Sequence, residues 1–128
     1  MQNFRVVIGF FQCYTIHNKS LWIDKGGNAL LCALILLRHG IRQDFEDKNW
    51  RQTAERPHDT PLSENGFRQA HDAGRFLQNE RIDYIFASPF LRALQTADVV
   101  ASYLNLPIYV EHGFMERLDP KWFDAMPE

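Results

Sequence analysis

Three things are scarce in this 128-residue sequence: cysteine, charge of a single sign, and long apolar runs. Its two cysteines, Cys13 and Cys32, lie too far apart to form the closely spaced pair of a metal site. Fourteen Lys and Arg against sixteen Asp and Glu give a formal net charge of −2 without a basic block, which argues against a nucleic-acid partner. The apolar run at residues 29–37 is much shorter than the roughly 20 residues of a membrane-spanning helix, so we expect no membrane partner.

The remaining composition is that of one small globular domain. Hydrophobic residues make up 45% of the chain and charged residues 23%, which is enough apolar material for a core and too little charge for a disordered chain. Cys32 lies inside an apolar run, and the apolar start at residues 4–11 is not followed by the small-residue cleavage site of a signal peptide. We therefore predict a reduced, cytoplasmic protein, and leave its oligomeric state open.

Secondary-structure signals divide the chain after residue 28. Residues 1–28 alternate poorly and form an N-terminal segment of unknown role, whereas residues 29–128 carry the pattern of a domain. In order along that domain we predict a buried strand in about the second half of residues 29–37, a helix capped by Ser63, a strand at 82–87, a helix capped by Ser88 and ending at Asn105, and a strand at 107–110. Strands alternating with helices predict an α/β fold with a parallel sheet.

Arginines follow two of the predicted strands. Arg38, His39 and Gly40 come directly after the first strand with Arg42 close behind, and Arg92 lies in the first turns of the last helix. Ligands of parallel α/β folds bind at the carboxyl ends of the strands. A guanidinium binds phosphate oxygens through paired hydrogen bonds, and neighbouring cations disfavour a charged imidazole. These residues predict an anionic substrate and a neutral, nucleophilic His39.

Three segments together resemble the histidine phosphatase superfamily, also called phosphoglycerate mutase-like. They are residues 36–42 (LLRHGIR), 59–70 (DTPLSENGFRQA) and 88–97 (SPFLRALQTA), and their order and spacing also match. The resemblance covers about residues 30–123 and implies a three-layer α/β/α fold. Residues 38–44 are most similar to the branch that includes the ubiquitin-associated SH3-containing protein phosphatases.

The resemblance implies a phosphomonoester hydrolase that works through a phosphohistidine, without metal or cofactor. It makes His39 the nucleophile, and Glu116, in the segment after the last predicted strand, the group that protonates the leaving oxygen. Arg38, Arg42 and Arg92 would hold the phosphate. The expected substrate is a phosphorylated small molecule or a phosphoprotein.

One feature of the family is missing from the sequence. The family's second pocket histidine lies in a later His-Gly segment, and the chain ends at Glu128 before such a segment. We interpret His112 as a loop histidine, and expect His58 and His71 to face solvent. The prediction is therefore a truncated histidine phosphatase domain at residues 29–128 with little activity of its own. The alternatives are a non-catalytic relative that binds phosphate or a phosphoprotein, and a phosphotransferase of the phosphoglycerate mutase type.

Overall fold

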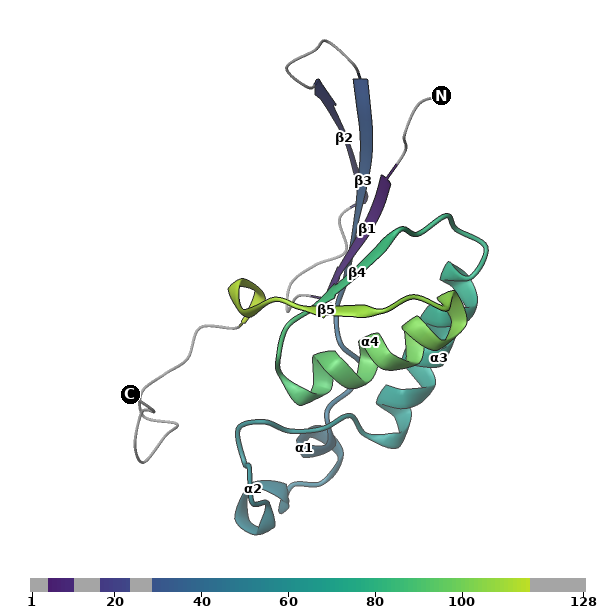
Figure 1. Cartoon of the computed structure of the whole chain (residues 1–128). Coiled ribbons are helices and arrows are strands. Elements are labelled where there is room, and N and C mark those ends of the chain that lie inside the picture. Colours follow the sequence, from purple (N-terminus) through teal and green to yellow (C-terminus); the bar gives the residue numbers. More distant parts are fainter. Residues whose placement is uncertain (1–4, 11–16, 24–28, 116–128) are drawn as a thin grey trace.

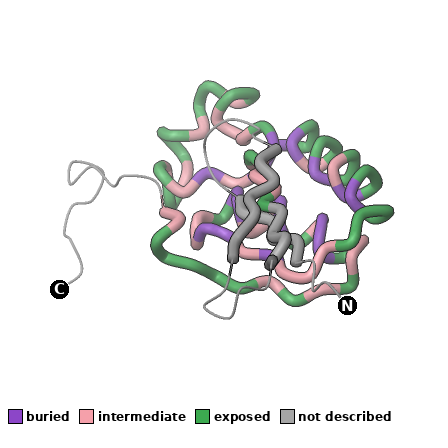
Figure 2. Tube along the Cα trace, turned by 90° about the horizontal axis from the view of Figure 1, so that it is seen from above, coloured by how far each residue is buried: buried purple, intermediate pink, exposed green. Residues whose placement is uncertain are grey.

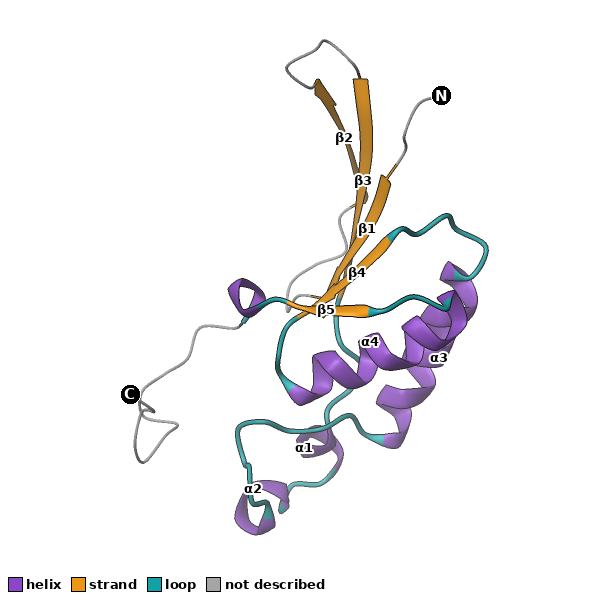
Figure 3. Ribbon diagram, in the orientation of Figure 1, coloured by secondary structure: helices purple, strands orange, loops and turns teal. Residues whose placement is uncertain are grey.

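A computed structural model of the chain describes residues 5–10, 17–23 and 29–115. The elements, drawn in Figures 1 and 3, are β1 (Arg5–Phe10), β2 (His17–Ile23), β3 (Ala29–Leu37), α1 (Gln43–Glu46), α2 (Trp50–Thr53), α3 (Glu64–Leu77), β4 (Tyr84–Ala87), α4 (Leu91–Leu104), β5 (Ile108–Val110) and a 3-10 turn, η1 (His112–Phe114). No helix within these ranges is long and apolar enough to span a membrane.

The five strands form one sheet in the order β2-β3-β1-β4-β5. The β1–β3, β1–β4 and β4–β5 pairs are parallel, which confirms the predicted α/β fold, and β2 runs antiparallel to β3. Two of these strands, β1 and β2, lie in the first 28 residues, where the sequence predicted no strand or helix. In the register of β1, Phe10 lies opposite both Leu37 of β3 and Ala87 of β4. Three strands therefore end at the same edge of the sheet.

Strand β3 occupies all of residues 29–37, so the prediction that only about its second half is a strand was wrong. Alanine and leucine favour helix in isolation. Here the strand is paired along one side with β1 and along the other with β2, and this pairing overrides the local preference. A strand in the middle of the sheet then leads directly into the arginine-rich loop.

Helix α3 begins where the sequence predicted. The Ser63 hydroxyl accepts a hydrogen bond from the Gly66 N–H at 3.1 Å, which satisfies one of the free donors of the first turn. Ala70, Gly74 and Leu77 are buried at helical spacing, and the positions between them are mostly exposed. Figure 2 shows buried and exposed positions alternating along the coiled parts of the chain trace. This face packs against α4, so that the two helices lie side by side (Figure 1).

Helix α4 begins later than predicted. Phe90 stands at the N-cap position instead of Ser88, and the first helical N–H, that of Leu91, donates to the Asp59 carboxylate at 2.8 Å. An acceptor from another segment thus replaces the expected serine cap. The helix ends as predicted at Asn105, which adopts the left-handed conformation with φ of 52°.

The core lies between α4 and the sheet. It contains Ile85 and Ala87 of β4 together with Ala97 and Val100 of α4, all of which are fully buried. Leu77 extends the cluster to α3. The core therefore holds the first turn of α4 in a fixed place beside the end of β4.

Candidate phosphate site

The predicted site residues meet at the carboxyl edge of the sheet. A cavity of about 260 Å³ is lined by Arg38, His39, Gly40, Ile41, Arg42, Phe45 and Gln69. The loop after β3 supplies most of this lining, and α3 supplies Gln69. Arg92 of α4, only 3% exposed, is close enough for its charge to act on His39. The structure thus brings together His39 and all three predicted phosphate-binding arginines.

The hydrogen bond of the His39 ring determines which of its nitrogens is reactive. Nδ1 lies 2.7 Å from the Gly40 carbonyl oxygen. Since a carbonyl can only accept, Nδ1 carries the proton, and Nε2 of the neutral ring keeps its lone pair. Nε2 is buried and has no hydrogen-bond partner among the described residues. A buried nitrogen with an unused lone pair has the electronic form of a nucleophile.

The surroundings keep this imidazole neutral. Burial is the largest influence and lowers the pKa of His39 below its ordinary value of 6.5. The charges of Arg92, Arg38 and Arg42 lower it further, in that order, while the hydrogen bond to Gly40 opposes them. His39 is therefore uncharged at neutral pH although its neighbours make the cavity positive.

A carboxylate holds one of the arginines. Arg42 donates to Asp44 through Nε at 2.8 Å and through Nη2 at 2.6 Å, a two-point bond that fixes the plane of the guanidinium. Arg51 lies 3.7 Å from the same carboxylate. The hydrogen bond from Arg42 lowers the pKa of Asp44, so the carboxylate stays charged. Sequence reasoning missed Asp44 because nothing in its local pattern distinguishes it from other surface acids.

Arg92 is held differently. Its guanidinium lies over the Phe90 ring, 4.3 Å from the ring centroid, in a cation–π contact. Its backbone carbonyl accepts a hydrogen bond from the Thr96 hydroxyl at 2.8 Å. Burial strengthens the field of such a charge, because little water is near to screen it.

Side chains from one segment bind backbone groups of another throughout the site. Thr96 accepts from the Gly40 N–H at 3.2 Å, and Gln69 accepts from the Ile41 N–H at 3.0 Å. Gln95 accepts from the Leu62 N–H at 2.7 Å. Sequence reasoning missed all three residues, although a threonine beside the apolar stripe of α4 was a usable signal. With the Asp59 bond to α4, these contacts join the three sequence segments into one structure.

Two glycines allow the loop after β3 to touch α3. A Cβ added to Gly40 would lie 2.4 Å from the Gly66 carbonyl oxygen, and one added to Gly66 would lie 2.1 Å from the Ile41 carbonyl oxygen. Neither contact is tolerable for a larger residue. Gly40 lines the cavity and also leaves room for the first turn of α3.

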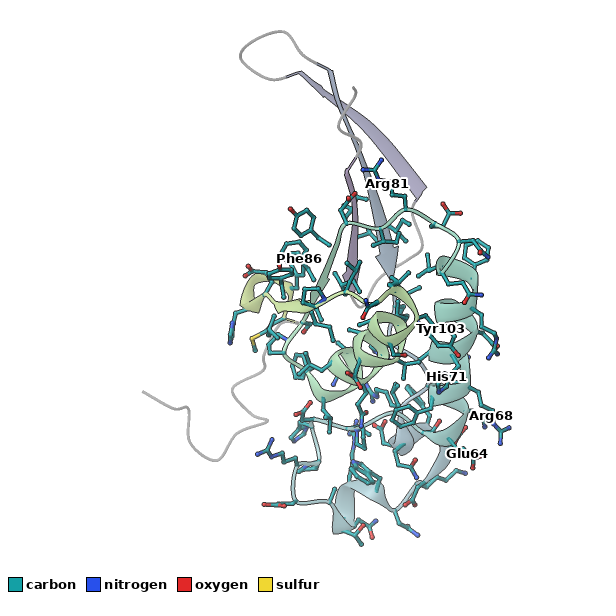
Figure 4. The ribbon with its side chains drawn as sticks, turned by 45° about the vertical axis from the view of Figure 1, so that its right-hand side comes forward. Glu64, Arg68, His71, Arg81, Phe86 and Tyr103 are labelled. Atoms are coloured by element: carbon teal, nitrogen blue, oxygen red, sulfur yellow. The ribbon has the colours of Figure 1, made fainter. Side chains whose placement is uncertain are left out.

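The other histidines named above do not line this cavity. The predicted acid Glu116 falls outside the described residues. His112 is exposed in η1 and His58 is exposed in its loop, as expected. His71 is exposed on α3, but its Nδ1 lies 3.0 Å from the Tyr103 hydroxyl of α4. Both residues are labelled in Figure 4. Within the described ranges, no group of three or more His, Cys, Asp or Glu side chains could hold a metal ion.

The site brings a half-buried, neutral histidine together with three arginines at the carboxyl edge of an α/β sheet, an arrangement that suits an anionic group. The comparison with known families agrees. The chain belongs to the histidine phosphatase superfamily (branch 1), whose family model matches residues 34–124.

Individual relatives point to phosphatases. The chain is 37% identical over 87 residues to the uncharacterised phosphatase PhoE of Bacillus subtilis, which covers 68% of this chain and 43% of PhoE. It is 45% identical over 94 residues to the fructose-2,6-bisphosphatase TIGAR of Xenopus laevis, covering 73% of this chain and 33% of TIGAR. The chain thus spans less than half the length of these relatives.

A solved structure is also similar. The phosphoserine phosphatase of Entamoeba histolytica, in complex with 3-phosphoglyceric acid, matches with a TM-score of 0.50 and 27% identity. The match covers 66% of this chain and 40% of that one. Similarity in both sequence and fold therefore supports the family assignment.

Proposed function

We propose that this protein hydrolyses phosphomonoesters through a phosphohistidine formed on His39. The observation that carries the proposal is the state of the ring: Nδ1 is bound to the Gly40 carbonyl, and Nε2 is buried with its lone pair unused beside three arginines. An unprotonated nitrogen can attack phosphorus, whereas an imidazolium cannot. Membership in the superfamily supports the same chemistry.

The reaction consists of two displacements at phosphorus. The guanidinium groups of Arg38, Arg42 and Arg92 bind the phosphoryl oxygens and stabilise the charge that spreads over them in the transition state. Nε2 of His39 forms a bond to phosphorus as the ester P–O bond breaks, and the leaving oxygen takes a proton, which the family resemblance assigns to Glu116. Water then attacks the phosphohistidine, the P–N bond breaks, and inorganic phosphate leaves.

The substrate class stays a proposal: a phosphorylated small molecule or a phosphoprotein. A cavity of about 260 Å³ is small for a ligand site and suits a phosphoryl group with only part of its leaving group. Ile41 and Phe45 line the cavity and are 37% and 67% exposed, so the rest of the substrate would contact an apolar rim. No metal or cofactor enters this chemistry.

The test is a burst measurement with stoichiometric protein and p-nitrophenyl phosphate. We expect about one nitrophenolate per chain in the wild-type protein and in H71A, which removes an exposed histidine from the neighbouring helix, and none in H39A. A burst detects the first displacement even when hydrolysis of the P–N bond is slow, so it can be read although little turnover is predicted for this chain. An unchanged burst in H39A would contradict the proposal.

A calorimetric titration with inorganic phosphate accompanies the burst. Phosphate binding without any burst in the wild-type protein would also contradict the proposed hydrolysis. That result would support the non-catalytic, phosphate-binding alternative instead. Burst and binding together separate the two functions.

A further inference from the structure

The nucleophilic loop is held on both sides of Gly40 by side chains from two different helices. The peptide unit before the Gly40 Cα contributes the Gly40 N–H, which donates to Thr96 of α4 at 3.2 Å. The peptide unit after it contributes the Ile41 N–H, which donates to Gln69 of α3 at 3.0 Å.

The bond to Gln69 acts on His39 through one rigid plane. The Ile41 N–H and the Gly40 carbonyl belong to the same peptide unit, which is planar, so fixing the direction of one group fixes that of the other. That carbonyl accepts the hydrogen bond from the protonated Nδ1 of His39, with 2.7 Å between Nδ1 and the oxygen. Gln69 therefore aims the acceptor that sets the state of the ring.

The bond to Thr96 connects the loop to the phosphate-binding helix. The single hydroxyl proton of Thr96 is donated to the Arg92 carbonyl at 2.8 Å, which leaves the oxygen lone pairs to accept from the Gly40 N–H. Thr96 is only 1% exposed, so water does not compete for these positions. A backbone group of the Arg92 turn and one of the nucleophile loop thus share one hydroxyl.

We propose that Gln69 and Thr96 are positioning residues that hold His39 as the Nδ1–H tautomer, with Nε2 free to react. The tautomer of a neutral imidazole is set by the hydrogen bonds that its nitrogens make. When the Gly40 carbonyl is no longer aimed at Nδ1, the proton redistributes to Nε2, and the ring loses its reactive lone pair. The catalytic meaning of this arrangement rests on the proposed function, but the tautomer can be measured without any turnover.

The experiment is long-range proton–nitrogen NMR on the 128-residue chain labelled with 15N-histidine, recorded above pH 7 and assigned with H39A. We expect a protonated Nδ1 and an unprotonated Nε2 in the wild-type protein. Gln69→Leu removes the acceptor from an exposed position and should raise the Nε2–H population about fivefold, the effect of one ordinary hydrogen bond. Thr96→Val, which keeps the side-chain shape, should shift it in the same direction.

Conservative variants separate positioning from general loss of structure. Thr96→Ser keeps the hydroxyl and Gln69→Glu keeps an acceptor oxygen, so both should retain the wild-type tautomer. Because Thr96 is buried, each protein is checked by circular dichroism, and a failure of Thr96→Val to fold leaves the exposed Gln69 pair as the decisive comparison. A wild-type tautomer in a folded Gln69→Leu protein would overturn the proposal, as would equal shifts in Gln69→Leu and Gln69→Glu.

The result is independent of the proposed hydrolysis. If the tautomer shifts as expected while the wild-type protein gives no burst with p-nitrophenyl phosphate, the positioning role stands and the hydrolytic function fails. If the burst occurs and the tautomer does not respond, the reverse holds.

Discussion

Arg92, beside the cavity, and the arginines on the outer face of α3 are chemically identical but lie in opposite surroundings. Arg92 is 3% exposed and stacks on Phe90. The Arg68 side chain is 68% exposed and pairs with Glu64 one helical turn away, and Figure 4 shows both at the molecular surface. Arg75 pairs in the same way with Asp72. Arg92 differs from Arg68 and Arg75 in burial and not in the chemistry of the side chain.

This difference decides what each charge can do. Water and salt screen an exposed ion pair, which typically contributes well below about 1 kcal/mol to stability. Beside the cavity, the charges of Arg92, Arg38 and Arg42 contribute to the low pKa of His39. A phosphate entering that cavity would meet the same field. The number of arginines in a sequence therefore says little about a site until their burial is known.

The largest expected effect comes from removing the buried arginine. Arg92→Ala should weaken binding of inorganic phosphate about 30-fold or more, because truncating a buried charge partner costs about 2–5 kcal/mol. Arg92→Lys keeps the charge but loses the planar pair of donors, so its affinity for phosphate should lie between those of the wild-type protein and Arg92→Ala. Calorimetry measures the affinity, with Arg68→Ala as the matched surface control. Equal losses in Arg92→Ala and Arg68→Ala would show that burial does not distinguish Arg92 from the surface arginines.

A smaller effect is expected where the loop touches α3. In Gly66→Ala the new Cβ would lie 2.1 Å from the Ile41 carbonyl oxygen. Overpacking of this kind costs about 3 kcal/mol, whereas alanine gains about 1 kcal/mol over glycine in a helix, so unfolding should become easier by about 2 kcal/mol. In the control Gly113→Ala the Cβ meets only a flexible Glu111 oxygen at 3.3 Å. Urea denaturation compares them, and similar midpoints would contradict the close contact.

The pH dependence follows from the lowered pKa of His39. The unfolded chain, with an ordinary histidine pKa of 6.5, takes up the proton first on acidification, so the stability from neutral His39 is complete above pH 6.5. It is lost as the pH falls from 6.5 through the lower pKa of the folded state. The burst rate should likewise be constant above pH 6.5 and fall only below it. In His39→Gln the free energy of unfolding should lose the pH dependence that His39 causes below pH 6.5. A burst rate that already declines above pH 6.5 in the wild-type protein would be inconsistent with a lowered pKa of His39.

The smallest effect should come from the exposed pair. Arg68→Ala breaks the contact with Glu64 and should change the free energy of unfolding by less than about 0.5 kcal/mol, as is usual for such pairs on a helix. The small loss should shrink further in 1 M salt. Urea denaturation at two salt concentrations measures both. A loss comparable to that of Gly66→Ala would show that exposure is the wrong criterion.

Local patterns allowed part of this structure to be predicted. The 14 residues of α3 carry their own cap at Ser63 and their own apolar spacing, so this helix was found from the sequence alone. Arg38, His39 and Arg42 are neighbours in the chain, and the family resemblance placed Arg92 beside them. In each case the signal lies within a few residues or within a recognisable motif.

What the sequence did not reveal depends on contacts between distant residues. Thr96 binds an amide 56 positions away, and Gln69 one 28 positions away. Asp59 accepts from the first helical N–H of α4, that of Leu91, which lies 32 positions further along the chain. This bond places the start of α4 after Ser88. Likewise, β1 takes its place only by pairing with β3 and β4. Side-chain bonds to remote backbone groups leave no periodic trace in a sequence.

The most direct test of the account is to find the atom that accepts the phosphoryl group. The protein is mixed with p-nitrophenyl phosphate, stopped in alkali, which preserves phosphohistidine, and digested for mass spectrometry. We predict one phosphoryl group per chain on His39, identified as the Nε2 isomer by 31P NMR, and none in H39A. A phosphoryl group on another residue, or on Nδ1 of His39, would contradict the claim that the loop holds this histidine ready to react through Nε2.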